Sequence, residues 1–332
     1  MKCPRCALIL SVAALAGLVP ATTTPAVAAS AQPAGNTTSL IAACRVAATI
    51  PVGGVPMWIA GNYRIYVPDS EGPGNTVSVI GARRNRVIAS IPVGSAPAGV
   101  AVDWKTNRIY VANRGDGTVS VVDGQTETVA ATIPVGGFLE GVAANWKTNR
   151  IYVAQERTVA VISGQTNTVT ATLPLTGVAP YGVAVNPWTN RIYVANKFGT
   201  VLVINGQTNK VVATIPVGTA PGFVAVNPNT NTIYVTNAQS NTVSVINGQT
   251  RTVTATIPVG TEPTGVAVNR ATDVIYAANV GDNTVSVING QTNAVVATIP
   301  VGLRPGGVAV NWKINRAYVA NAGGTVSVLA GC

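Results

Sequence analysis

The sequence has 332 residues, of which 47% are hydrophobic and only 10% are charged, and its formal net charge is +10 at pH 7. It contains no histidine, which excludes His-dependent lyase mechanisms and His-ligated haem or copper sites and removes the commonest general base. The positive charge favours anionic partners such as nucleic acid, wall polymers or lipid headgroups, although it also simply keeps a protein soluble.

Residues 1–29 have the features of a secretory signal peptide. Two basic residues near the start precede the apolar stretch Ala7–Val19, which is too short to span a membrane, and Ala26–Ala28 fits a cleavage site. We therefore expect a secreted or otherwise extracytoplasmic protein, at the cell surface or in the periplasm, with no transmembrane segment in the mature chain. A retained N-terminal anchor is the alternative. Residues 30–43 are expected to form a flexible spacer.

Three short motifs recur along the rest of the chain. Ile-Pro-Val-Gly, Ile-Tyr-Val and Thr-Val-Ser-Val-Ile, with close variants, each occur seven times at spacings of 40 to 44 residues. A period in this range indicates a propeller, a solenoid or an array.

One period contains four short runs rich in Val, Ile, Thr and Tyr. In the sixth period these runs are Pro263–Asn269, Val274–Asn279, Thr284–Ile288 and Ala294–Val301, and turn residues bound each of them. No helical periodicity is present. The pattern predicts an all-β, seven-bladed β-propeller with four antiparallel strands per blade. Neighbouring blades would cover both faces of each sheet, which accounts for the high hydrophobic content.

The repeats start out of phase, which predicts how the ring closes. Cys44–Val52 reads as an outermost strand without preceding partners, and Pro305–Leu329 reads as three strands that lack an outermost one. The N-terminal strand should therefore complete the last blade of a domain spanning residues 44–332. Aligned on an intact repeat, Cys44 and Cys332 lie two positions apart in one hairpin turn, within reach of a disulfide. We predict a bond between them in an oxidising compartment, the alternative being two unrelated thiols.

The stretch Val224–Asn237 contains the literal sequence Tyr-Val-Thr-Asn at its end. On these residues the chain resembles the YVTN-repeat β-propeller family of exported and surface proteins, over about Cys44–Cys332. The resemblance implies a binding or surface-layer module, while related propellers include enzymes and nucleic-acid binders. The family repeat marks no catalytic residue, so none is carried over.

Because the strands alternate in direction, the loops sort onto two ends of the ring. One end collects the links between blades and surrounds the channel mouth, where propellers usually hold ligands. At this end some loop residues differ from repeat to repeat while the residues around them stay the same. These variable residues form a candidate site for a polar ligand, and the alternative is ordinary loop variation. From this group we single out Met57, Trp58, Glu140, Tyr181, Thr264 and Arg304.

The opposite end collects the turns between the first and second strands, where Trp-Lys-x-Asn-Arg recurs. Aromatic rings interleaved with cations can stack bases and neutralise phosphates, or grip acidic glycans. They can equally stack on one another within a turn that shields the blade edge. The candidate residues for an anionic polymer are Trp104, Lys105, Arg108, Trp146, Lys147, Arg150, Trp188, Arg191, Trp312, Lys313 and Arg316.

These observations predict a monomeric, non-catalytic binding or surface-interaction module with no catalytic residue, metal site or cofactor. A cell-surface component is one class of partner. An anionic-polymer binder, with single-stranded nucleic acid or acidic wall glycan as ligand, is the first alternative. The second is a hydrolase or lyase at the channel mouth that uses some of the 11 scattered acidic residues and a bound cation.

Overall fold

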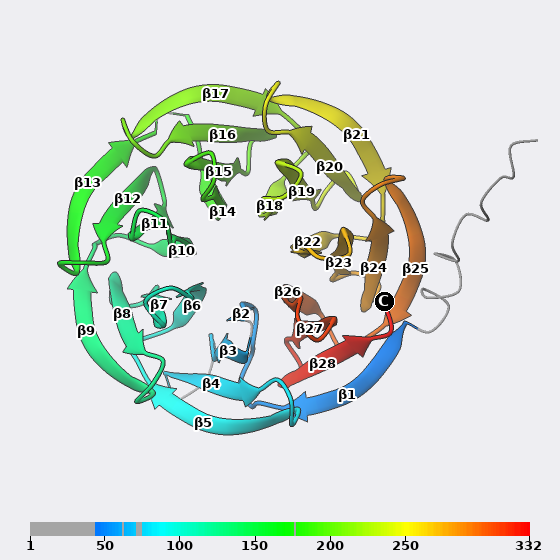
Figure 1. The fold of residues 1–332 in the computed structure, drawn as a ribbon, viewed down its shortest axis with the longest axis horizontal. Helices are drawn as coiled ribbons and strands as arrows, with labels where there is room; N and C mark the ends of the chain where they lie inside the picture. Colours follow the sequence, from blue (N-terminus) through cyan, green and yellow to red (C-terminus); the bar gives the residue numbers. More distant parts are fainter. Residues whose placement is uncertain (1–43, 62, 71–74, 176) are drawn as a thin grey trace, which may run out of the picture. The chain divides into compact units, whose positions relative to one another are not determined.

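The computed structural model describes residues 44–61, 63–70, 75–175 and 177–332. These residues form seven four-stranded antiparallel sheets that surround a common axis as the blades of a propeller (Figure 1). The predicted fold class is confirmed. The predicted signal peptide and spacer, residues 1–29 and 30–43, lie outside the described residues. Within the described ranges, no helix is long and apolar enough to cross a membrane.

Each blade runs from an innermost strand at the axis to an outermost strand at the rim. Blades 1 to 4 consist of β2 (Ala60–Gly61), β3 (Arg64–Pro68), β4 (Thr76–Gly81) and β5 (Arg86–Pro92); β6 (Pro97–Asp103), β7 (Arg108–Asn113), β8 (Thr118–Asp123) and β9 (Thr128–Pro134); β10 (Leu139–Asn145), β11 (Arg150–Gln155), β12 (Thr158–Ser163) and β13 (Thr168–Pro174); and β14 (Pro180–Asn186), β15 (Arg191–Asn196), β16 (Thr200–Asn205) and β17 (Lys210–Pro216). Blades 5 to 7 consist of β18 (Pro221–Asn227), β19 (Thr232–Asn237), β20 (Thr242–Asn247) and β21 (Thr252–Pro258); β22 (Pro263–Asn269), β23 (Val274–Asn279), β24 (Thr284–Asn289) and β25 (Ala294–Pro300); and β26 (Pro305–Asn311), β27 (Arg316–Asn321), β28 (Thr325–Ala330) and β1 (Arg45–Pro51).

The last blade is closed by the first strand, as the phase of the repeats predicted. β1 pairs antiparallel with β28, with Ile50 opposite Val326 and Arg45 opposite Ala330. Cys44 and Cys332, at the ends of these strands, form a disulfide with their Cα atoms 4.5 Å apart. Both the strand exchange and the predicted disulfide are therefore confirmed.

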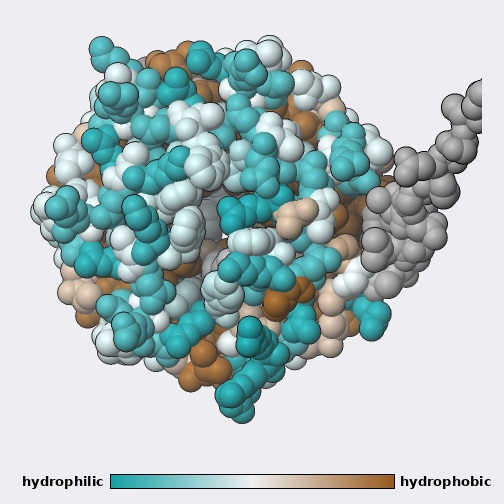
Figure 2. Space-filling model, in the orientation of Figure 1, coloured by the Kyte–Doolittle hydropathy of each residue, from teal (hydrophilic) through white to brown (hydrophobic). Residues whose placement is uncertain are grey.

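The two ends of the ring differ in the loops that they carry. We call the end with the first-to-second and third-to-fourth strand turns of each blade the turn face. The opposite end, with the second-to-third strand loops and the links between blades, is the link face. The space-filling view in Figure 2 shows one end of the ring, hollowed at its centre.

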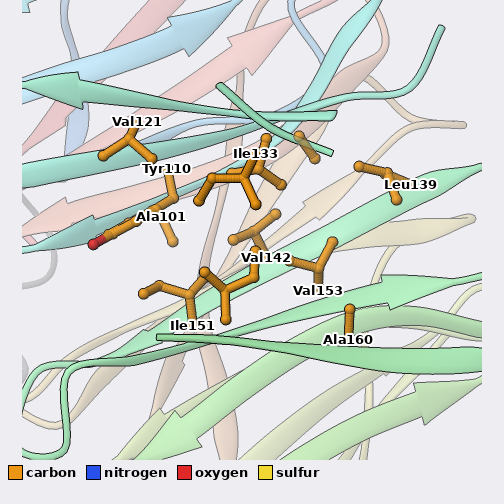
Figure 3. Packing of buried hydrophobic residues seen from close by; sticks show 12 residues of the cluster. Ala101, Tyr110, Val121, Ile133, Leu139, Val142, Ile151, Val153 and Ala160 are labelled. Carbon is orange, nitrogen blue, oxygen red and sulfur yellow. The ribbon is translucent and has the colours of Figure 1, made fainter. Parts of the chain in front are cut away.

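The apolar core lies between adjacent blades. Between blades 2 and 3, Tyr110 and Val121 of one sheet pack against Ile151 and Val153 of the next, and all four side chains are fully buried (Figure 3). Neighbouring blades cover both faces of each sheet in this way. The inner strands are therefore apolar throughout, and apolar residues do not alternate with polar ones. Burial on this scale is the main stabilising contribution in such a fold.

Polar side chains join the blades along the turn face. The guanidinium groups of Arg64, Arg108 and Arg150 each donate from one blade to a backbone carbonyl oxygen in the third-to-fourth strand turn of the next, at 2.7 to 2.8 Å. The acceptors are Gly124, Gly164 and Gly206. In blades 1 to 3, an arginine at the start of the second strand therefore holds the neighbouring blade, and the ion pair of Arg64 with Glu127 adds to the first of these contacts.

A second set of inter-blade contacts uses asparagine. The last residue of the innermost strand donates its Nδ2 hydrogen to the turn residue of the next blade, as Asn145 does to Asn190 at 2.8 Å and Asn186 to Asn231 at 2.7 Å. The accepting asparagines have φ values near +50°, a conformation that asparagine tolerates better than most residues. Asn190 and Asn231 thus fit the backbone of their turns and bridge the blades.

Blade 2 departs from this pattern because its equivalent residue is Asp103. The Asp103 side chain is fully buried, and its Oδ2 has no hydrogen-bond partner among the described residues. Across the interface, the equivalent acceptor Asn149 Oδ1 also lacks a partner. Two acceptors cannot bond to each other, and an unsatisfied buried polar atom destabilises a fold by about 1 to 3 kcal/mol.

We therefore expect Asp103→Asn to stabilise the protein. The amide supplies the donor that this interface lacks, and the free energy of unfolding should rise by about 1 kcal/mol in urea denaturation at neutral pH. The matched control is the reverse change one blade on, Asn145→Asp, which should lower stability by a similar amount. A neutral or destabilising Asp103→Asn would contradict this account of the interface.

Candidate functional site

Three aromatic rings meet across the channel near the link face. Trp58 of blade 1 lies 4.5 Å from Phe223 of blade 5 and 5.6 Å from Tyr181 of blade 4, measured between ring centroids. Because blades 4 and 5 stand across the ring from blade 1, these side chains meet over the axis (Figure 1). We call them the aromatic plug.

Glycines explain why the plug fits. Gly99, Gly141, Gly182, Gly265 and Gly307 occupy the strand position that Trp58 and Phe223 take in blades 1 and 5. At these glycines the innermost strands of adjacent blades approach closely, so that a Cβ on Gly99 would lie 2.2 Å from the Glu140 carbonyl oxygen. Five small residues leave room at the axis that the two large rings fill.

Charged groups surround the plug. Glu140 is buried and forms an ion pair with Arg114, and burial raises the pKa of the Glu140 carboxyl even though Arg114 acts to lower it. Burial also raises the pKa of the Tyr181 hydroxyl to about 12. The Lys197 ammonium lies 4.4 Å from the centroid of the Tyr181 ring. These contacts are internal and hold the loops around the plug together.

The structure brings together four of the six predicted link-face residues. Met57, Trp58, Tyr181 and Arg304 line a cavity of about 190 Å³. Glu140 forms an ion pair with Arg114, and the Thr264 hydroxyl donates to the backbone carbonyls of Pro305 and Gly306 at the start of β26, at 3.2 to 3.3 Å. Among the described residues, no group of three or more acidic or cysteine side chains is arranged to hold a metal ion. A ligand at this end therefore remains a prediction.

A larger cavity, of about 850 Å³, opens at the turn face. Its rim is built by the first residue of the first-to-second strand turn in blades 2 to 7, which directly follows the innermost strand. These residues are Trp104, Trp146, Pro187, Pro228, Arg270 and Trp312. Tyr63 and Arg64 complete the rim in blade 1.

The predicted aromatic residues of blades 2 to 4 form a continuous cluster on this rim. The Trp104 and Trp146 ring centroids are 4.4 Å apart, and those of Trp146 and Trp188 are 5.6 Å apart with the rings nearly perpendicular. The Lys147 ammonium lies 3.5 Å from the centroid of the Trp188 ring. Trp104 and Trp188 each keep more than half of their surface exposed, at 56% and 57%. Open aromatic faces and adjacent cations are thus available to a ligand.

The second half of the rim contains residues that the motif did not reveal. The Arg270 guanidinium stacks 4.2 Å from the centroid of Trp312, and Lys313 lies 4.8 Å from the ring of Tyr63 and donates to its hydroxyl. Blades 6 and 1 lack the Trp-Lys pair, so a motif search passes over Arg270 and Tyr63. Aligning the turns on the preceding asparagine would have placed Arg270 at the tryptophan position.

The arginines of the predicted set have a different environment from the lysines. Arg108, Arg150 and Arg316 donate to backbone carbonyls of the next blade, whereas Lys105, Lys147 and Lys313 are exposed. Arg191, at the same position in blade 4, is half-buried. The exposed part of this set therefore consists of the three lysines, Trp104 and Trp188.

Charge is strongly segregated between the two faces. The turn face carries fifteen Lys and Arg residues: Arg45, Arg64, Arg83, Arg84, Arg86, Lys105, Arg108, Lys147, Arg150, Arg191, Lys210, Arg251, Arg270, Lys313 and Arg316. Its acidic residues are Asp103, Asp123, Glu127 and Asp273, and the first of these is fully buried. The described part of the link face carries Arg114, Arg157, Lys197 and Arg304 against Asp69, Asp116, Glu140, Glu156, Glu262 and Asp282. The net positive charge is thus concentrated on the turn face, where Arg64, Arg270 and Lys313 line the larger cavity.

Comparison with known proteins defines the fold only. A scan against protein-family models and a search of curated proteins found no match. Among solved structures, the chain is similar to a chain of Kuenenia stuttgartiensis hydrazine synthase, with a TM-score of 0.74 and 19% sequence identity over 83% of this chain and 95% of that one. At this identity the similarity supports the propeller architecture.

Proposed function

We propose that this protein is a non-catalytic binding module that holds an anionic polymer on its turn face. The observation that carries the proposal is the concentration of cations on the turn face, together with the exposed rings of Trp104 and Trp188 on that face. Exposed ammonium groups neutralise phosphates or carboxylates, and aromatic faces stack on bases or sugars. A field of one sign over a cleft also raises the local concentration of an oppositely charged ligand.

Export and family membership are part of the same proposal. Residues 1–29 would direct the chain out of the cytoplasm and be removed, leaving a monomeric propeller released outside the cell or associated with its surface. The Cys44–Cys332 disulfide supports an oxidising location. The Tyr-Val-Thr-Asn sequence at Tyr234–Asn237, together with the seven blades, supports membership of the YVTN-repeat family.

The proposal predicts salt-dependent binding that depends on three lysines. We expect the triple variant Lys105→Ala, Lys147→Ala and Lys313→Ala to bind a long oligo-dT or polygalacturonate at least tenfold more weakly. For single-stranded nucleic acid, each lost phosphate contact reduces the slope of log K against log salt by about 0.7, so the triple variant should lose about 2 in slope. Fluorescence anisotropy over a salt series measures both quantities.

The matched control removes the same charge from the opposite face. Arg157→Ala, Lys197→Ala and Arg304→Ala together should leave the affinity and the salt slope within error of those of the parent protein. An equal loss in both triple variants would assign binding to net charge alone and overturn the turn-face site. Trp104→Ala tests the aromatic part of the site, because stacking of a base on an aromatic ring contributes about 1 to 3 kcal/mol. A variant that binds oligo-dT as tightly as the parent protein would remove Trp104 from the site.

A further inference from the structure

The turn-face cavity continues inward as a well with apolar walls. Below the rim, its lining comes from the penultimate residues of the innermost strands or their neighbours, one in each of six blades: Ala60, Val102, Ala144, Val185, Val226 and Val310. We call the part of the cavity that these six residues line the central well. The aromatic plug of Trp58, Tyr181 and Phe223 lies further along the same axis, toward the link face.

The size of the central well suits a short hydrocarbon chain. The whole turn-face cavity, which also extends beside Asn107, Gly124 and Gln125 in the turns of blade 2, has a volume of about 850 Å³, within the range of pockets that bury small molecules. Five strand positions separate the rim residue Trp104 from Gly99, which lies at the level of the plug. At about 3.3 Å per residue, the strand covers roughly 16 Å between the rim and the level of the plug. An extended octyl to dodecyl chain spans a comparable length.

Charge at the mouth of the well is of one sign. Its lining residues include Arg64, Arg270 and Lys313 but no aspartate or glutamate. Arg64 pairs with Glu127, whereas neither Arg270 nor Lys313 forms an ion pair with an acidic side chain of the described residues. Both of these cations are instead held in place by aromatic rings, Arg270 by Trp312 and Lys313 by Tyr63.

We propose that the central well binds an amphiphilic anion. The hydrocarbon chain enters between the valine-lined walls toward the aromatic plug, and the headgroup is held at the mouth by Arg270 and Lys313. The polymer site of the proposed function shares only Lys313 with the well, since its other contacts are Lys105, Lys147 and the tryptophans of blades 2 to 4. The proposal therefore extends the polymer-binding function to a second ligand class at an adjoining site.

Isothermal titration calorimetry with a series of alkyl phosphates, each below its micelle concentration, tests the proposal. Burial of each methylene should raise the affinity two- to fourfold, up to the chain length that fills the well, after which the affinity should level off. Inorganic phosphate alone should bind at least a hundredfold more weakly than decyl phosphate. Decyltrimethylammonium, with the same chain and the opposite charge, should bind at least tenfold more weakly.

Two sets of variants separate the chain from the headgroup. Val226→Phe narrows the well in blade 5, whose turn contributes no cation to the rim, and should weaken decyl phosphate binding at least tenfold while oligo-dT binding is unchanged. Val185→Phe provides a second narrowing variant if the first does not fold. Arg270→Ala with Lys313→Ala should weaken binding tenfold or more while the gain per methylene persists.

Several results would overturn the central-well proposal without affecting the polymer site. These are an affinity that does not change with chain length, equal binding of the cationic amphiphile, and full binding by a folded narrowing variant. Vesicles containing phosphatidylglycerol distinguish free amphiphiles from a bilayer surface. If decyl phosphate prevents the protein from floating with the vesicles, the result supports the central-well proposal. If decyl phosphate does not reduce flotation and no soluble alkyl phosphate binds, the proposal is overturned.

Discussion

Loss of the Cys44–Cys332 disulfide should lower the stability of the propeller more than any other single covalent change. The bond joins residues 288 positions apart, and loop-entropy arguments give roughly 5 kcal/mol as an upper value for a loop of this length. The reason is that the disulfide restricts the unfolded chain far more than the folded one, in which β1 already pairs with β28. We expect the Cys44→Ser, Cys332→Ser double variant to fold but to unfold at a clearly lower urea concentration.

Reduction of the parent protein provides an independent route to the same state. Treatment with a phosphine reductant should lower its unfolding midpoint to that of the double variant, and the double variant itself should not respond to reductant. Hydrogen exchange should show β1 as the strand that loses most protection. Equal midpoints for reduced and oxidised protein would contradict the role of the bond in holding the ring closed.

The second large effect is expected at Gly141, in the innermost strand of blade 3. A Cβ added there would lie 2.5 Å from the Tyr181 carbonyl oxygen and 3.1 Å from the Val183 nitrogen, both backbone atoms of the next blade. Backbone cannot move aside as a flexible side chain does, so two blades would have to separate. Overpacking of this kind costs about 1 to 3 kcal/mol, and we expect Gly141→Ala to fall at the upper end of this range in urea denaturation.

Gly222 provides the matched control for this substitution. It also lies in an innermost strand, but a Cβ there would be 3.5 Å from the Thr236 hydroxyl and 3.8 Å from the Thr264 carbonyl oxygen, which are ordinary contacts. Gly222→Ala should therefore change the free energy of unfolding by less than about 0.5 kcal/mol or stabilise slightly by restricting the unfolded chain. Similar losses in the two variants would show that close approach of the strands is not the cause.

Sequence reasoning reached the site only in part. The recurring Trp-Lys turns could be assigned to one face because antiparallel strands return alternate turns to the same end. The stacking of Arg270 on Trp312 and of Lys313 on Tyr63 could not be predicted from the sequence. Each pair joins neighbouring blades, and Arg270 and Tyr63 lie outside the motif. The clamping role of Arg108 was also missed, because its acceptor is a backbone carbonyl 56 residues away. The segregation of charge could have been counted from the strand order alone.

The amino-acid sequence by itself determined the seven blades, the exchange of the first strand into the last blade, and the disulfide that joins them. These follow from a repeat period, its phase and two cysteines, which are properties read along the chain. The tertiary structure alone decided which end of the channel is open. Trp58, Tyr181 and Phe223 come from blades 1, 4 and 5 and meet only because the ring brings those blades across one axis. Contacts across the axis depend on the geometry of the closed ring, and a sequence motif within one repeat gives no information about the distance between opposite blades.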